Sequence, residues 1–196
     1  MKQKKIKINW KTFLKKGVKT SRGIWGCYCY EGTQGSGKTS SMVAFIHDNT
    51  NLEIYANIKS LKNIDYTYIE GIQGLLSLIK FLDKKEKSNK QIVILYDEIF
   101  TLLDRNSKLD NDIRKEIIKF LSQLRKRKII LLTSCQCWGE LPLYFRRLCR
   151  YEISCRIVPT PFFSFIIKSF YDAENMSYDK TEKRSRNNTT RNFITT

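Results

Sequence analysis

The segment from Gly32 to Thr39 constrains the fold of this chain more than any other part of the sequence. It matches the P-loop pattern G-x-x-x-x-G-K-[ST] at every fixed position, with the residues Gly32, Thr33, Gln34, Gly35, Ser36, Gly37, Lys38 and Thr39. Its glycines allow the backbone to curl so that several N–H groups point at one phosphate. An apolar, β-rich segment precedes the loop and a helix-like segment follows it. The sequence therefore predicts a strand, a phosphate-binding loop and a helix in that order.

The residue types in this loop predict ATP and Mg²⁺ as its ligands. Lys38 would reach the β- and γ-phosphates, and the hydroxyl of Thr39 would bind Mg²⁺. Ser40 opens the following helix and completes the predicted nucleotide-binding segment.

Apolar segments of strand length alternate with helical stripes along the rest of the chain. We expect strands at 24–31, 52–58, 91–98 and 128–135, and helices from the loop to about 47 and at 71–82, 110–124 and 143–148. This alternation predicts a three-layer α/β domain with a mainly parallel central sheet. Together with the P-loop, it resembles the RecA- or ASCE-like class of P-loop NTPases. Two further strands, at about 150–158 and 162–171, are expected to form a C-terminal β-hairpin.

The formal net charge of the 196 residues is +17, which favours a polyanionic partner such as nucleic acid or an anionic membrane surface. A lysine-rich surface that only keeps the protein in solution is the alternative. Residues 1–22 are predicted to form a basic N-terminal arm, 23–171 the P-loop ATPase domain and 172–196 a polar, flexible tail. No stretch reaches the ~18 apolar residues of a membrane span, so we expect no integral membrane span.

The six cysteines are expected to be reduced and mostly buried. Cys27 and Cys29 lie two apart on a predicted strand and therefore share one face. A Cys₄ zinc site built from this pair and from Cys135 and Cys137 is the less favoured alternative.

Two adjacent acids, Asp97 and Glu98, end the buried strand at 91–98 in the Walker B arrangement. The carboxylate of Asp97 would hold the magnesium, directly or through water, and Glu98 would polarise a water for in-line attack on the γ-phosphate. A helix cap followed by an acid in the first helical turn is the structural alternative. A water-activating base favours ATP hydrolysis coupled to motion over phosphoryl transfer to a small molecule.

Polar and cationic residues after this strand extend the candidate site. Gln136 lies just past the strand at 129–134, where its amide would sense the γ-phosphate or orient the water, with an ordinary loop glutamine as the alternative. Several arginines also follow, and in ring ATPases the arginine of one subunit stabilises the γ-phosphate of its neighbour. For any one of them, contact with solvent or with a nucleic-acid phosphate is the competing interpretation.

These residues together resemble the FtsK/HerA superfamily of DNA-pumping ATPases, and more closely its viral genome-packaging branch. The resemblance spans about residues 24–157. It rests on the P-loop and on the segments Tyr55-Ala56-Asn57-Ile58, Ile94-Leu95-Tyr96-Asp97-Glu98, Leu103-Asp104-Arg105-Asn106-Ser107-Lys108, Gln123-Leu124-Arg125-Lys126-Arg127, Thr133-Ser134-Cys135-Gln136 and Glu140-Leu141-Pro142-Leu143-Tyr144-Phe145-Arg146-Arg147. The family often has T-x-Q or T-S-Q, whereas here Cys135 separates Ser134 from Gln136.

The resemblance implies a homo-oligomeric ring, a hexamer or pentamer, that threads DNA into a capsid with little sequence preference. It implies that Gln136 is the γ-phosphate sensor and that Arg105, Arg146 and Arg147 are candidates for the arginine supplied in trans. It further implies a viral capsid vertex as a partner, and a location in the host cytoplasm or in the virion.

Four other functions compete with genome packaging, and one of them is DNA transfer in bacterial conjugation or between plasmid hosts. Zonula occludens toxin-like ATPases of filamentous phage extrusion resemble this chain, but they generally carry a membrane span after the ATPase domain. A small-molecule kinase would need a substrate pocket and a lid, and the sequence has no lid-like insertion. A basic scaffold that only binds nucleic acid would not need Lys38, Asp97 and Glu98 together.

Overall fold

A computed structural model describes residues 24–49, 51–85, 90–103, 110–159, 164–173, 177–178, 184–185 and 191–195. Their main feature is an eight-stranded sheet with the strand order β10-β7-β6-β1-β5-β4-β2-β3. The strands are β1 Gly26–Glu31, β2 Leu52–Ala56, β3 Thr67–Tyr68, β4 Gln91–Tyr96, β5 Ile129–Cys135, β6 Cys149–Pro159, β7 Ser164–Asp172 and β10 Arg191–Thr195. The six strands from β6 to β3 are parallel, and β7 and β10 are antiparallel to their neighbours.

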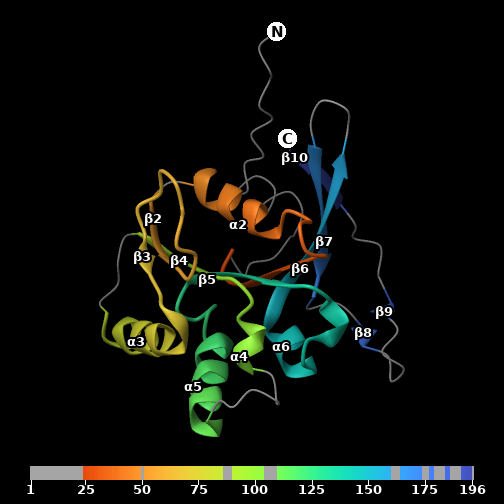
Figure 1. Cartoon of the computed structure of the whole chain (residues 1–196). Helices are drawn as coiled ribbons and strands as arrows, with labels where there is room; N and C mark the ends of the chain where they lie inside the picture. Colours follow the sequence, from red (N-terminus) through yellow and green to blue (C-terminus); the bar gives the residue numbers. More distant parts are fainter. Residues whose placement is uncertain are drawn as a thin grey trace.

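Helices cover both faces of this sheet (Figure 1). The helix α2 lies on one face and α3, α5 and α6 lie on the other. Their bounds are α2 Lys38–His47, α3 Gly71–Lys84, α5 Asn111–Ser122 and α6 Leu143–Leu148, with the short α4 Phe100–Leu103 and the 3₁₀ turn η1 Trp138–Glu140 between them. The prediction of a three-layer α/β domain with a mainly parallel sheet and a C-terminal hairpin is confirmed.

The sequence patterns explain why these elements form where they do. The run Val93–Leu95 in β4 is fully buried because both faces of this central strand are covered. In α3 the buried residues Leu75, Leu76 and Ile79 form one helical stripe. The helix α5 begins after Asp110, whose carboxylate accepts a hydrogen bond from the backbone N–H of Asp112 at 2.9 Å.

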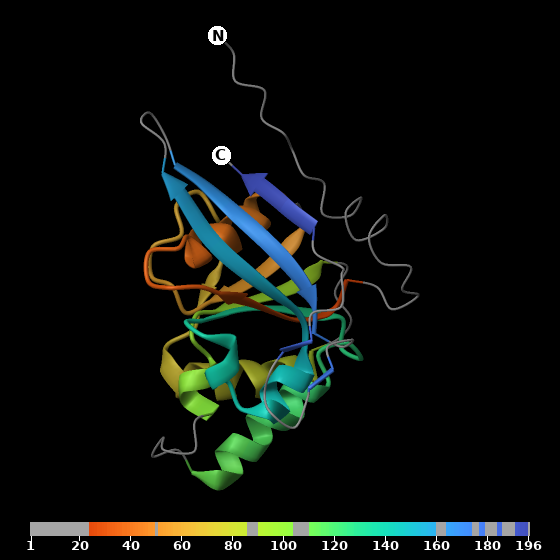
Figure 2. The same cartoon turned by 90° about the vertical axis from the view of Figure 1, so that its right-hand side faces the viewer.

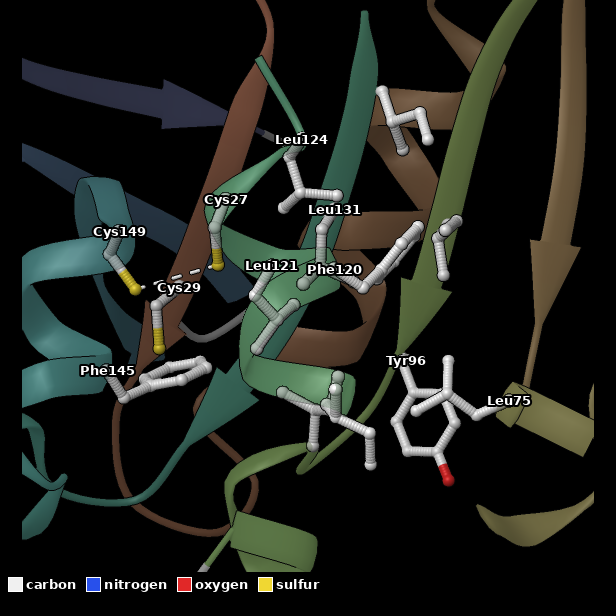
Figure 3. Close-up of a cluster of buried hydrophobic side chains, with 14 of the residues drawn as sticks. Cys27, Cys29, Leu75, Tyr96, Phe120, Leu121, Leu124, Leu131, Phe145 and Cys149 are labelled. Carbon is white, nitrogen blue, oxygen red and sulfur yellow. Dashed lines mark hydrogen bonds between the residues drawn. The ribbon is translucent and has the colours of Figure 1, made fainter. Parts of the chain in front are cut away.

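Four of the cysteines, Cys27, Cys29, Cys135 and Cys149, belong to one cluster of the buried core. Figure 3 shows Cys27, Cys29 and Cys149 beside Phe145 of α6. The Sγ atoms of Cys27 and Cys149 are 3.6 Å apart, and those of Cys29 and Cys135 are 3.5 Å apart. Burial raises the pKa of the Cys29 and Cys149 thiols well above its usual value, so both stay protonated at neutral pH. Cys137 is exposed, and no group of three or more ligating side chains among the described residues could hold a metal ion.

The segment predicted as a polar tail contains three strands that its sequence did not suggest, because it lacks apolar periodicity. Besides β10, these are β8 Ser177–Tyr178 and β9 Arg184–Ser185, which pair with each other. β10 pairs with β7 from Arg191 opposite Phe170 to Thr195 opposite Ile166. The predicted basic arm at 1–22 lies outside the described residues. Within the described part of the chain, no helix has the length and apolar character that a membrane crossing requires.

Candidate nucleotide site

The loop after β1 has the backbone of a phosphate cradle. Gly32 and Gly37 both have positive φ angles, of 150° and 85°, and Gly37 is the N-cap of α2. The ammonium of Lys38 turns back into the loop and donates hydrogen bonds to the carbonyl oxygens of Gly32 at 2.7 Å and Thr33 at 2.9 Å. The loop therefore wraps around one cation at the N-terminus of a helix, where an anion is favoured.

A matched pair of glycine substitutions tests this packing. A Cβ on Gly32 would lie 2.6 Å from the carbonyl oxygen of Cys155, whereas a Cβ on Gly35 would have no atom within 4 Å. Both residues have positive φ, but the 76° of Gly35 is close to the left-handed helical region, whereas the 150° of Gly32 lies far from it, where a side chain is tolerated less. We expect Gly32→Ala to lower the free energy of unfolding in urea by about 1–3 kcal/mol more than Gly35→Ala, because it combines greater backbone strain with overpacking. Equal losses would contradict this close contact.

Three polar side chains converge on Asp97, which directly follows β4. The Thr39 hydroxyl donates to Asp97 Oδ2 at 3.3 Å, and the Ser134 hydroxyl donates to Asp97 Oδ1. The Asn57 side chain forms hydrogen bonds with both backbone groups of Asp97, its N–H and its carbonyl. Asn57 Oδ1 accepts from Asp97 N–H at 2.8 Å, and Asn57 Nδ2 donates to the Asp97 carbonyl at 3.1 Å. Strands β1, β5, β4 and β2 are neighbours, so their carboxyl ends bring these four residues together.

Glu98 occupies a special position in the turn that follows. Its φ of 55° lies in the left-handed region, which costs a non-glycine residue about 1–2 kcal/mol. The turn is held by the Thr101 hydroxyl, which donates to the Glu98 carbonyl at 2.8 Å, and by Ile99 N–H, which donates to the Thr133 hydroxyl at 3.3 Å. The carboxylate-bearing side chain of Glu98 stays exposed at the carboxyl edge of the sheet.

Gln136 lies just beyond β5, which pairs directly with β1. Its side chain is exposed. The loop that carries it is tied to the strand before the P-loop, because Trp138 N–H donates to Glu31 Oε1 at 3.0 Å. Gly32 N–H also donates to the Cys135 carbonyl, at 3.3 Å. The backbone around Gln136 is thus fixed against the start of the P-loop.

The candidate arginines differ in accessibility. Arg146 is buried in the last turn of α6, with 8% of its surface exposed, whereas the adjacent Arg147 is exposed. Arg105 lies outside the described residues. Of the two described candidates, only Arg147 presents its side chain to solvent.

The residues of the site fit a nucleotide with magnesium. The Ser36 hydroxyl is buried inside the loop and has no hydrogen-bond partner among the described residues, and an oxygen of a bound phosphate would satisfy it. The Thr39 hydroxyl and the Asp97 carboxylate lie within hydrogen-bond distance of each other, and both are oxygen ligands of the kind that Mg²⁺ takes. The Lys38 ammonium, which donates to the Gly32 carbonyl, would supply the cation for the phosphates.

Sequence reasoning did not assign roles to two residues at this site. Asn57 was part of a family segment, but nothing in its local pattern showed that it holds the Asp97 backbone. Ser134 was noted only for its spacing from Gln136, whereas its hydroxyl reaches Asp97. A polar residue at the tip of a buried strand beside the P-loop strand was the available signal for Ser134.

Comparison with known proteins identifies the fold. The N-terminal domain of zonular occludens toxin from Neisseria meningitidis is similar with a TM-score of 0.58 and 20% identity, over 87% of this chain and 93% of that one. A KaiC-like protein from Pyrococcus horikoshii OT3 is similar with a TM-score of 0.54 and 12% identity, over 91% of each chain. A third similar structure is the genome packaging NTPase B204 from Sulfolobus turreted icosahedral virus 2, in complex with ATP-gammaS. Its TM-score is 0.51 and its identity 12%, over 87% of this chain and 96% of that one.

At these identities the similarity establishes the fold alone, which is that of RecA-like P-loop NTPases. No family model matches the sequence. No curated protein matches it either.

Proposed function

We propose that this chain is an ATP hydrolase that translocates DNA and packages a viral genome into a capsid. The observation that carries the ATPase part is the hydrogen bond between Thr39 of the P-loop and Asp97 at the end of β4. It joins the phosphate cradle to a carboxylate, and Glu98 follows directly as a base. The similarity in fold to a genome packaging NTPase supports the packaging part.

The proposed chemistry divides among the residues of this site. Magnesium, when bound with ATP, neutralises charge on the β- and γ-phosphates. Thr39 and Asp97 would hold it, and Lys38 would leave the loop carbonyls to bind the phosphates. Glu98 would take a proton from the attacking water, and Gln136 would orient that water or sense the γ-phosphate.

Two neighbouring side chains keep Asp97 in place. Asn57 fixes the backbone of Asp97, and Ser134 fixes one of its carboxylate oxygens. With Oδ1 engaged by Ser134, Oδ2 is the oxygen directed at Thr39. Such outer partners set the orientation of a carboxylate ligand and strengthen its binding to metal.

The DNA part rests on charge. A net charge of +17 creates a field that attracts the phosphate backbone without reading its sequence. The basic arm at 1–22, with Lys2, Lys4, Lys5 and Lys7, is proposed to contribute to this binding. A homo-oligomeric ring around the DNA, docked at a capsid vertex in the infected cell or the virion, is part of the same proposal.

DNA should stimulate ATP hydrolysis, and its binding should depend steeply on salt. A protein that contacts six to ten phosphates loses about 10³–10⁵ in affinity between 50 and 200 mM salt, whatever the sequence. Hydrolysis rates with and without DNA, and fluorescence anisotropy with two unrelated DNA sequences over a salt series, measure both effects. Removing residues 1–20 should weaken the binding.

The same assay separates the competing functions. A kinase would respond to a small-molecule acceptor and not to DNA, and a scaffold would bind DNA without hydrolysing ATP. Hydrolysis that DNA leaves unchanged would contradict the translocase.

An ATPase of filamentous phage assembly is the second candidate. The similarity to the zonular occludens toxin domain favours it, since that structure has the higher TM-score and identity of the three. Association with purified empty capsids would support packaging, whereas association with an inner-membrane assembly complex would support extrusion.

A further inference from the structure

The β6–β7 hairpin is the element that stands beside the P-loop. Its two strands pair without interruption from Tyr151 opposite Asp172 to Pro159 opposite Ser164. In Figures 1 and 2 the hairpin twists out of the sheet and rises on the side of α2, past the start of that helix. It is therefore a wall on one side of the phosphate cradle.

The loop packs closely against this wall at two points. A Cβ on Gly32 would lie 2.6 Å from the carbonyl oxygen of Cys155 in β6. A Cβ on Gly37 would lie 2.6 Å from Cδ1 of Ile166 in β7. The backbone at both ends of the loop is thus in contact with the hairpin.

On the hairpin face toward α2, the buried pair Cys155 and Lys168 is followed by the apolar pair Ile157 and Ile166. Cys155 defines that face, because its Sγ lies 3.9 Å from the Ser41 hydroxyl of α2. Ile157 lies two residues further along β6 and shares the face, and it pairs directly with Ile166. Ile157 is 36% exposed, and Ile166 is half-buried. Two isoleucine side chains therefore form a partly exposed apolar platform next to the loop.

The direction of a bound nucleotide follows from the metal side of the site. Thr39 and Asp97 mark the end at which the β- and γ-phosphates and magnesium would lie, and β4 and β5 are on that side of β1. The strand on the other side of β1 is β6. The ribose and base of the same nucleotide would therefore leave the loop toward the β6–β7 hairpin.

We propose that Ile157 and Ile166 are the base-binding platform of this site, and that the aromatic base of the nucleotide packs on them. This inference rests on the proposed ATPase function and adds the residues that hold the non-phosphate end of the substrate. Apolar side chains line most small-molecule sites, because burying an aromatic surface supplies affinity while a few polar groups fix orientation.

The test compares a ligand with a base to one without. Calorimetric titrations would use ATPγS and inorganic tripolyphosphate, both with Mg²⁺, on the full chain. Ile157→Thr keeps a β-branched side chain but removes apolar surface, and it should weaken ATPγS binding about three- to tenfold. Its affinity for tripolyphosphate should not change. The matched control Val158→Thr, on the opposite face of β6, should change neither affinity.

Three results would overturn the platform and leave the ATPase proposal standing. One is an equal loss of affinity for both ligands in Ile157→Thr, and another is no loss of affinity for either ligand. The third needs no variant: wild-type protein that binds ATPγS no more tightly than tripolyphosphate gains nothing from the base. Binding of neither ligand by the wild type would overturn the ATPase proposal itself, and the platform with it.

Discussion

Glu98→Gln is expected to stop ATP hydrolysis while MgATP remains bound. A positioned general base contributes about 10²–10⁴ in rate, and glutamine keeps the size of the side chain without its proton affinity. Lys38, Thr39 and Asp97 are unchanged in this variant, so binding should be retained. The backbone of Glu98 has a φ of 55°, and glutamine adopts that conformation no less readily than glutamate.

Two further variants complete this experiment. Lys38→Ala removes the phosphate-binding cation and should abolish productive binding of ATP, in contrast to Glu98→Gln. Glu140→Gln is the matched control, because Glu140 is an exposed glutamate in the turn η1 and has no assigned role. Single-turnover hydrolysis and calorimetry would separate chemistry from binding. Equal hydrolysis rates in wild type and Glu98→Gln would remove Glu98 from the water-activating role.

The second large effect is expected at Arg147. In the proposed ATPase, Lys38 and magnesium would act on the γ-phosphate from one side, and an arginine from a neighbour on the open side contributes about 10³–10⁵ in rate. Arg147 is exposed at the end of α6, so its side chain is available to a second subunit. We therefore expect Arg147→Ala to lower ATP turnover by up to this factor without changing the oligomer.

Mixing variants tests whether Arg147 acts in trans. In a mixed ring, a Lys38→Ala subunit supplies the arginine and an Arg147→Ala subunit supplies an intact site, so part of the activity should return. Arg156→Ala is the matched control, since Arg156 is an exposed arginine on β6. If Arg147→Ala is fully active, or if mixed rings form and no activity returns, the assignment to Arg147 is wrong. Arg105, which lies outside the described residues, is then the reserve candidate.

Arg146 requires a separate readout because it is 8% exposed. Its replacement removes packing as well as charge, so a loss of activity alone would not assign it to catalysis. The thermal unfolding temperature of each arginine variant separates the two causes. A lowered temperature indicates a destabilised fold, whereas an unchanged temperature with lost activity indicates that the arginine acts on the neighbour's site.

The sequence by itself determined the local parts of this protein. The spacing of glycines, lysine and threonine in the P-loop is a local pattern, and the structure gives that segment the expected loop before a helix. The pattern of apolar residues placed β4, β5, α3 and α5 close to their observed bounds. This works because buried positions recur with a fixed period in a helix and form a continuous or alternating run in a strand. The order of strands and helices then sufficed for the fold class.

Only the tertiary structure decided which residues from distant segments meet. Asn57, Ser134 and Asp97 are joined because β2, β4 and β5 end at one edge of the sheet, and no local pattern encodes strand neighbours. The difference in burial between the adjacent Arg146 and Arg147 likewise depends on how α6 packs. The contact of the β6–β7 hairpin with the P-loop depends on strand pairing and twist, which the whole sheet sets rather than any single segment.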